Sequence, residues 1–185
     1  MAKPKLFIDF DNTLVNSTAA ICEVYNEEYK SHVGFVPADW RQSQLYDFSD
    51  ICPLASPDVI EWMFAQDEFF ENLWPLPYAR EAIRKLKQDF ELYIVSIGTP
   101  LNLSKKSYYI SKVFPMIDNV ILLGTKSCAA DKSIVDMSDG CMIDDSLQAL
   151  NSSNADVKIV FGPELKYNKT NQYMRLPSWG TIIGE

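Results

Sequence analysis

Five short and almost continuously apolar runs alternate with stretches of helical pattern along this chain of 185 residues. Runs of this length and composition are typical of strands that are buried on both faces of a parallel sheet. Strands that alternate with helices imply right-handed crossovers, so the sequence predicts a doubly wound α/β fold. The predicted strands are Lys5–Ile8, Glu91–Val95, Val120–Leu123, Cys141–Ile143 and Val157–Phe161.

Three helices are expected between these strands, over Pro77–Gln88, Ser104–Phe114 and Ser146–Leu150. In the first of them, apolar side chains recur at helical spacing and charged side chains occupy the opposite face. The helices therefore have an apolar side with which to cover the predicted sheet.

The segment that follows the first strand breaks this alternation. Residues 16–75 are rich in aromatic side chains, and loops of that length without secondary structure are uncommon. Ser17 is a plausible N-cap for a helix that ends near Tyr29, and Pro57-Asp58 is typical of another helix start. We therefore expect a small helical cap over 16–75, inserted into a core formed by 1–15 and 76–185.

The charge balance bears on the class of partner. The chain has 25 acidic and 17 basic residues, a formal net charge of −8, and this argues against binding of a polynucleotide through its backbone. No apolar run approaches the length of a membrane span, and the start of the chain does not fit a signal peptide. No membrane partner is expected, and the sequence leaves the oligomeric state open.

Cysteine and histidine usage narrows the chemistry. The four cysteines are scattered without a C-x-x-C pair, and the chain has one histidine, so a zinc site of the usual kind is excluded. Scattered cysteines without a secretion signal predict reduced thiols and a cytoplasmic location. The cysteines are Cys22, Cys52, Cys128 and Cys141.

Acidic residues stand where predicted strands end, although aspartate is depleted in strands. Asp9 and Asp11 close the first strand, and Asp144-Asp145 close the fourth. Ligands of such sheets bind beyond the carboxyl ends of the strands. The second strand ends in Ser96-Ile97-Gly98-Thr99, and Lys132 lies twelve positions before Asp144.

Each of these four features, namely the two pairs of acids, Ser96 and Lys132, also has a purely structural interpretation. An aspartate at a strand end is often a turn former or helix cap, a lone Ser96 is often a capping hydroxyl, and a lone Lys132 is usually a solvated surface charge. The occurrence of all four pieces in order, each at the end of the appropriate strand, favours a chemical role.

The set suits phosphoryl transfer. Mg²⁺ prefers hard oxygen ligands, which Asp9, the Asp11 backbone carbonyl and one of Asp144 and Asp145 would supply. One carboxylate can attack phosphorus, and a second, two residues on, can transfer the proton. Lys132 would offset the charge on the transferring group. Ser96 and the amides beside Gly98 would hold phosphate oxygens.

The four motifs resemble those of the haloacid-dehalogenase superfamily of phosphohydrolases, which run Asp-x-Asp-x-Thr, Ser/Thr, Lys and a paired acid. The resemblance implies a Rossmann-like core in which Asp9 is the nucleophile and Asp11 the acid/base. It implies that Ser96 and Lys132 bind phosphate and that Asp144 and Asp145 are the metal acids. Asp145 matches the second acid of the pair and is the one expected to coordinate Mg²⁺ directly.

Within that superfamily the chain is most similar to the 5′(3′)-deoxyribonucleotidase family. The similarity rests on Phe-Ile-Asp-Phe-Asp-Asn-Thr-Leu-Val at 7–15, the short helical cap, Leu76-Pro77, and a tail with Tyr167-Asn168, Arg175 and Ser178-Trp179. The chain departs from the family at 96–99, where a Thr-Ser-Pro type loop is usual, and at Ser146, where an arginine is common.

The resulting prediction is a Mg²⁺-dependent phosphomonoesterase that hydrolyses nucleoside monophosphates, foremost deoxyribonucleotides, through an aspartyl-phosphate. The alternatives are a phosphatase of another small metabolite, such as a sugar phosphate, and a catalytically idle binding module. Aromatic residues of the cap either stack on a base or form the cap's own core, and core packing is favoured for Trp62, Phe64, Phe69 and Phe70. Arg175 and Trp179 of the tail likewise either contact the substrate or only pack against the core.

Overall fold

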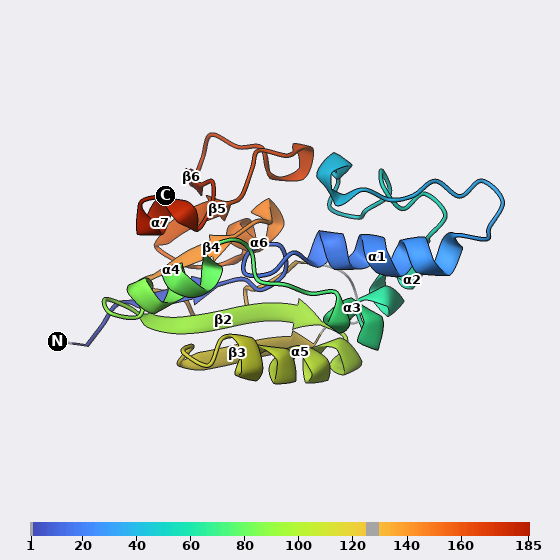
Figure 1. Ribbon diagram of the computed structural model, residues 1–185. Helices are drawn as coiled ribbons and strands as arrows, with labels where there is room; N and C mark the ends of the chain where they lie inside the picture. The colour runs from blue at the N-terminus through green and yellow to red at the C-terminus, as the bar shows by residue number, and fades with distance from the viewer. Residues whose placement is uncertain (1, 125–129) are drawn as a thin grey trace.

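The computed structural model describes residues 2–124 and 130–185, and its elements are shown in Figure 1. Six strands form one sheet in the order β3-β2-β1-β4-β5-β6, and every neighbouring pair is parallel. The strands are β1 (Lys5–Ile8), β2 (Glu91–Gly98), β3 (Asn119–Gly124), β4 (Gly140–Asp144), β5 (Val157–Phe161) and β6 (Met174–Leu176). The five predicted strands and the doubly wound α/β class are confirmed, and β6 was not predicted.

Alternate residues of β1 face opposite layers of core, as the pleat of a strand requires. Leu6 and Ile8 lie in one cluster with the helices α4 (Ala79–Leu86) and α5 (Pro100–Val113). Phe7 lies in a second cluster with α6 (Leu147–Ser152). Because both faces of β1 are covered, its side chains are apolar on both sides, which is why its apolar run is nearly continuous.

Helix α5 begins earlier than the pattern from Ser104 predicts. The Thr99 side chain accepts a hydrogen bond from the Asn102 amide, and Pro100 stands at the first helical position. The short helix α7 (Gly180–Ile183) ends the chain and packs against α4.

Four helical segments fill the insert between β1 and α4. They are α1 (Ser17–Tyr29), η1 (Trp40–Gln42), α2 (Pro57–Met63) and α3 (Asp67–Glu71). In Figure 1 they lie beyond the arrowhead of β2, at the carboxyl end of that strand. The insert therefore stands on the side of the sheet where ligands of such folds bind.

The two ends of the insert meet at one point of the core. The Asn16 amide donates a hydrogen bond to the Trp74 carbonyl over 3.1 Å, and the Leu76 amide donates one to the Leu14 carbonyl over 2.9 Å. The chain thus leaves the core and returns to it through two adjacent segments, near the predicted boundaries. The division into a core and a separate cap stays a prediction.

The N-cap of α1 is Asn16, so the expectation that Ser17 caps this helix is wrong. The Asn16 side chain accepts a hydrogen bond from the Ala19 amide over 3.0 Å. Ser17 is the first residue of the helix, and its hydroxyl donates to Asp11 instead. Either residue type suits an N-cap, and the approach of Asp11 decides between them.

Within the described residues, no helix combines the length and apolarity needed to cross a membrane. Cys22, Cys52 and Cys141 are free thiols, and Cys128 lies outside the described residues. The cytoplasmic location stays a prediction.

Candidate active site

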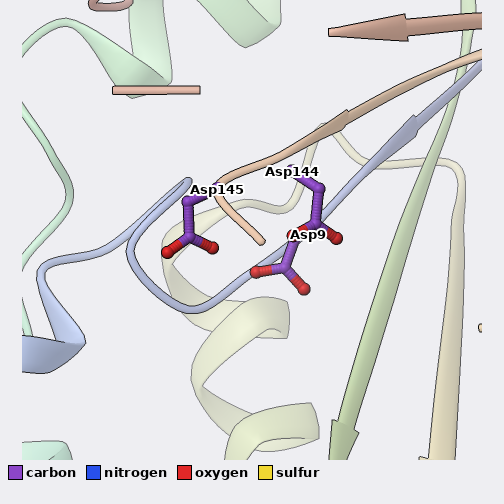
Figure 2. Close-up of side chains that lie close together, drawn as sticks. All are labelled: Asp9, Asp144 and Asp145. Carbon is purple, nitrogen blue, oxygen red and sulfur yellow. The ribbon is translucent and has the colours of Figure 1, made fainter. Parts of the chain in front are cut away.

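Three carboxylates converge where the order of the strands reverses. Asp9 follows β1, Asp144 ends β4, and Asp145 is the next residue. Each offers one oxygen, and the three oxygens all lie within 4.8 Å of one another. Figure 2 shows the side chain of Asp144 beside that of Asp9, with the Asp145 carboxylate on the adjacent turn of chain. All three residues are buried, so their mutual repulsion is poorly screened.

Lys132 supplies the cation of this cluster. Its Nζ lies 2.5 Å from Asp9 Oδ1 and 2.7 Å from Asp144 Oδ2, and the residue is only 2% exposed. Its backbone amide donates to the Ser152 hydroxyl over 2.9 Å, which fixes the segment that carries it. Lys132 is therefore a buried partner of the acids and not a solvated surface charge.

One lysine among three acids leaves the cluster short of positive charge. Burial, with the neighbouring Asp144 and Asp11, raises the pKa of Asp9 to about 7 although Lys132 opposes the shift. Burial, with Asp144 and Asp9, also raises the pKa of Asp145 well above its usual value. Burial alone would lower the pKa of Lys132, but its attraction to Asp144 and Asp9 raises it. The site holds excess negative charge that a cation would relieve.

Asp144 also has the turn-forming role that strand-end aspartates often have. Its Oδ1 accepts a hydrogen bond from the Ser146 amide over 2.8 Å, and Ser146 is itself the N-cap of α6. Asp144 can therefore form the turn and also belong to the acid cluster, because one carboxylate oxygen accepts from the Ser146 amide and the other from Lys132.

Asp11 lies on a tight turn beyond β1. Asn12 adopts a positive φ of 54°, and its side-chain oxygen accepts hydrogen bonds from both the amide and the hydroxyl of Thr18, each at 2.9 Å. Asp11 Oδ1 accepts from the Ser17 hydroxyl over 2.7 Å, and Oδ2 accepts from Lys106 Nζ over 2.5 Å. The Asp11 side chain thus lies apart from the three converged acids, with partners of its own.

Ser96 and Gly98 end β2 next to Asp11. The Ser96 hydroxyl is fully buried, accepts from Lys106 Nζ over 2.8 Å, and lies 3.4 Å from Asp11 Oδ2. A Cβ on Gly98 would collide with the Asn102 side chain, so glycine is needed there for close packing of α5. The structure places Gly98, Asp11, Lys106 and Lys132 on one cavity.

Two functional candidates were missed by the sequence reasoning. The Tyr167 hydroxyl donates to Asp145 Oδ2 over 2.6 Å, and Lys106 pairs with Asp11. Lys106 shares its helix face with the buried Leu103 and Ile110, at positions i−3 and i+4. A lysine on an apolar face is a signal that the sequence did contain.

A cavity of about 610 Å³ opens above these residues. Its floor carries the acids and lysines, and part of its wall comes from the insert. Four aromatic side chains of the insert line it, namely Trp40, Tyr46, Phe48 and Phe64. Volumes of this order suit small-molecule ligands.

Other aromatic residues of the insert and tail have packing roles. Phe69 is fully buried and its ring lies 5.1 Å from that of Phe70. The expectation that Trp62 also packs in the core of the insert is wrong, because Trp62 is 47% exposed. Trp179 is fully buried and its indole donates to the Thr13 carbonyl over 2.7 Å. Arg175 donates to backbone carbonyls at 162, 163 and 168, which holds the loop before β6.

A family profile and a curated relative match this chain over nearly its whole length. Residues 3–183 match the profile of the family described as 5′ nucleotidase, deoxy (pyrimidine), cytosolic type C protein. The chain is 28% identical over 182 residues to a 5′(3′)-deoxyribonucleotidase of Clostridium acetobutylicum, which covers 97% of this chain and 92% of that protein.

Solved structures share the fold at low sequence identity. A haloacid dehalogenase-like hydrolase of Streptococcus pneumoniae superposes with a TM-score of 0.64 at 14% identity, covering 98% of this chain and 97% of that one. The magnesium-bound HAD-hydrolase YfnB of Bacillus subtilis, whose structure reveals interdomain movement, has a TM-score of 0.57 at 15% identity, covering 100% of this chain and 98% of that one.

Proposed function

We propose a substrate and a mechanism from the premise that this chain belongs to the 5′ nucleotidase, deoxy (pyrimidine), cytosolic type C protein family. Membership makes it a phosphatase of the haloacid-dehalogenase type that acts on phosphomonoesters. The proposed substrates are nucleoside monophosphates, foremost deoxyribonucleoside monophosphates. The observation that carries the proposal is the position of Asp9, on the floor of a cavity whose wall carries aromatic side chains.

The acid cluster fits a divalent cation of the hard kind. Asp9, Asp144 and Asp145 present carboxylate oxygens within 4.8 Å of one another, and the cluster carries more negative than positive charge. These residues, with the Asp11 backbone carbonyl, would hold Mg²⁺. Bound there, Mg²⁺ would neutralise charge on the phosphate. The magnesium-bound relative of Bacillus subtilis supports this assignment.

In the proposed first half-reaction, a carboxylate oxygen of Asp9 attacks phosphorus while the bond to the leaving oxygen breaks. Asp11 gives its proton to that oxygen, and an aspartyl-phosphate remains on Asp9. In the second half-reaction, water attacks phosphorus and gives a proton to Asp11 while the bond between phosphorus and the Asp9 oxygen breaks. Phosphate is released and the Asp9 carboxylate is restored. Lys132 stays beside Asp9 and offsets charge throughout.

Substrate choice is assigned to the wall of the cavity. The motifs on the floor recognise phosphate alone, whereas aromatic faces bind flat bases at about 1–3 kcal/mol each. The Arg41 guanidinium lies 4.5 Å over the Trp40 ring at this wall and offers donors to a polar ring edge. A cavity of this volume on an acidic protein favours a monophosphate over a polynucleotide.

We further propose that residues 16–75 act as a cap. Beyond its two stems, the insert contacts α5 through hydrogen bonds and an ion pair. Asn102 Nδ2 donates to the Phe64 carbonyl over 2.6 Å, and the Tyr109 hydroxyl donates to the Leu73 carbonyl over 3.2 Å. Lys105 Nζ donates to the Ala65 carbonyl over 2.7 Å and lies 2.6 Å from Asp67 Oδ1. Buried apolar residues of the insert also pack in one cluster with those of α4 and α5. Opening of the cap would break these polar contacts and expose part of that cluster, and closure would restore both. Interdomain movement in the Bacillus subtilis relative supports this interpretation.

The test is a phosphate-release screen of the purified protein with Mg²⁺ and with EDTA. The panel contains ribo- and deoxyribonucleoside 5′- and 3′-monophosphates, sugar phosphates, and nucleoside di- and triphosphates, with Asp9→Asn as the inactive control. We expect kcat/KM for nucleoside monophosphates to exceed that for sugar phosphates, with di- and triphosphates poor. If sugar phosphates were hydrolysed as well as any nucleotide, the nucleotidase proposal would be wrong and only the assignment as a phosphatase would remain.

A further inference from the structure

Lys106 is a buried cation outside the four motifs. It lies on α5 and is 1% exposed. Its Nζ lies 2.5 Å from Asp11 Oδ2, 2.8 Å from Ser96 Oγ and 3.4 Å from the Ile97 carbonyl oxygen. The nitrogen also stands 5.2 Å from the centre of the Phe10 ring. The ammonium is therefore enclosed by the ends of β1 and β2.

A buried ammonium requires a counterion, because an uncompensated charge in the interior is strongly unfavourable. Within the described part of the chain, the ion pair of Lys106 is with Asp11 alone. Lys132 serves the other acid of strand one and contacts Asp144 as well. The two acids of the first motif are thus divided between two lysines, Lys106 on α5 and Lys132 on the segment before β4.

The contacts of Asp11 fix its carboxylate from two sides. Ser17, at the start of the insert, donates to Oδ1, and Lys106 donates to Oδ2. The side chain retains partial exposure toward the cavity, at 24%. A carboxylate held at both oxygens cannot rotate freely about its last bond, so its direction toward the cavity is set by these partners.

We infer that Lys106 is a positioning residue for Asp11. When Asp11 gives its proton to the leaving oxygen, a carboxylate remains, and the Nζ–H of Lys106 holds that carboxylate where it will receive the proton of the attacking water. The ammonium itself neither gains nor loses a proton in this sequence. The inference rests on the proposed function, because it concerns the proton that the proposed mechanism assigns to Asp11.

Leaving-group dependence separates this role from phosphate binding. The alkoxide that leaves from a nucleoside monophosphate needs a proton, whereas p-nitrophenolate leaves without one. Because kcat/KM reports the transfer to Asp9, a defect in Asp11 lowers it for the nucleotide and spares it for p-nitrophenyl phosphate. A defect in phosphate binding lowers both and weakens inhibition by inorganic phosphate.

The experiment compares Lys106→Met with the wild-type protein on both substrates. General acid catalysis is worth about 10²–10⁴-fold, so we expect kcat/KM for the nucleotide to fall about 100-fold and that for p-nitrophenyl phosphate less than about 10-fold. The inhibition constant of phosphate is expected to stay within about 2-fold. Lys112→Met, at the exposed end of the same helix, is the matched control and should change none of these values.

A double-mutant cycle tests whether Lys106 acts through Asp11, because a purely structural role of Lys106 would not depend on the presence of the Asp11 carboxylate. If Lys106 acts through Asp11, then Lys106→Met should cost about 3-fold or less in kcat/KM on an Asp11→Asn background. Thermal melts show which variants fold, and Lys106→Gln replaces Lys106→Met if the latter does not. Equal losses on both substrates, or a full additional loss in the double variant, would overturn the inference.

Failure of this inference and failure of the proposed function are distinguishable. The wild-type screen decides whether nucleotides are the substrates. The role of Lys106 is decided by how Lys106→Met changes the ratio of kcat/KM for an alkyl phosphate to kcat/KM for p-nitrophenyl phosphate. This ratio can be measured with any alkyl phosphate that the wild-type protein hydrolyses.

Discussion

The hydroxyl of Tyr167 donates a hydrogen bond to Asp145 Oδ2 over 2.6 Å, and so joins the C-terminal tail to the acid cluster. Burial and the neighbouring Asp145 raise the pKa of Tyr167, so the hydroxyl stays protonated and remains a donor. Tyr46 of the insert meets the same ring edge-on, with centroids 5.7 Å apart. This contact brings the insert, the tail and the acid cluster together at one point.

We expect Tyr167→Phe to weaken Mg²⁺ binding, because removal of the hydroxyl frees the Asp145 carboxylate to rotate. Partners of metal ligands typically contribute 10–100-fold in affinity, and about 10-fold is expected here. Calorimetric titration with Mg²⁺ measures the change directly. Tyr173→Phe is the matched control, since its hydroxyl contacts Asn151. Unchanged Mg²⁺ affinity in Tyr167→Phe would contradict the prediction.

Replacement of either acid of strand one should be severe. Asp9→Asn removes the attacking charge at nearly unchanged size, so turnover should fall by orders of magnitude. Asp11→Asn removes proton transfer, worth about 10²–10⁴-fold. Initial rates at saturating substrate measure both effects, and circular dichroism shows that each variant folds. Near-normal turnover by folded Asp9→Asn would rule out the nucleophile assignment.

The metal-free protein should lose stability as pH rises from about 4 to about 7. Burial and the neighbouring acids raise the pKa of Asp9 to about 7 in the folded state from 3.8, so the folded state binds this proton more tightly than the unfolded state. Between these values the unfolded chain releases the proton first, and the free energy of unfolding therefore falls with increasing pH. Melting temperatures in EDTA at about pH 5 and about pH 8 measure the change.

Asp9→Asn isolates the contribution of this one group, because other acids titrate in both proteins. The variant should show a smaller fall in melting temperature with pH and should melt higher than the wild-type protein at the alkaline end. Parallel curves for the two proteins would show that Asp9 does not hold the proton.

The two acids at the end of β4 should differ in their effect on the metal. Asp145→Ala is expected to raise the Mg²⁺ concentration needed for half-maximal activity more than Asp144→Ala does. Asp144 has additional structural contacts, with Lys132 and the Ser146 amide, so its replacement should lower the melting temperature more. Mg²⁺ titrations and melts of both variants test the ranking, and a reversed Mg²⁺ ranking would reassign the ligand within the pair.

Two tryptophans of the insert provide a matched test of substrate recognition. Trp40 lines the cavity, whereas Trp62 is 47% exposed and is absent from the cavity's lining. Trp40→Ala should lower kcat/KM for nucleoside monophosphates about 10-fold, in line with the loss of one base-stacking contact, and spare p-nitrophenyl phosphate. Trp62→Ala should change neither value. Equal effects of the two substitutions would remove Trp40 from base recognition.

Local sequence pattern identified the five longer strands because each carries a nearly continuous apolar run, and the three central strands β1, β2 and β4 are largely buried on both faces. It did not identify β6, whose three residues include an exposed Met174 and an Arg175 bound to loop carbonyls. A strand that short contains less than two periods of alternation, so its pairing with β5 depends on the fold around it.

The sequence by itself determined the fold class and placed Asp9, Asp11 and the Asp144-Asp145 pair at strand ends, because strand burial and the parallel connections follow from local periodicity. Only the tertiary structure decided that Lys106, and not its neighbour Lys105, turns toward Asp11, and that Asn16 caps the helix and leaves the Ser17 hydroxyl to the same carboxylate. Lys106 and Asp11 are 95 positions apart in the chain. Helical spacing places Lys106 on the same face as the buried Leu103 and Ile110, but it does not show which acid the lysine meets, because that charge is supplied by the end of a distant strand that reaches the helix only in the folded protein.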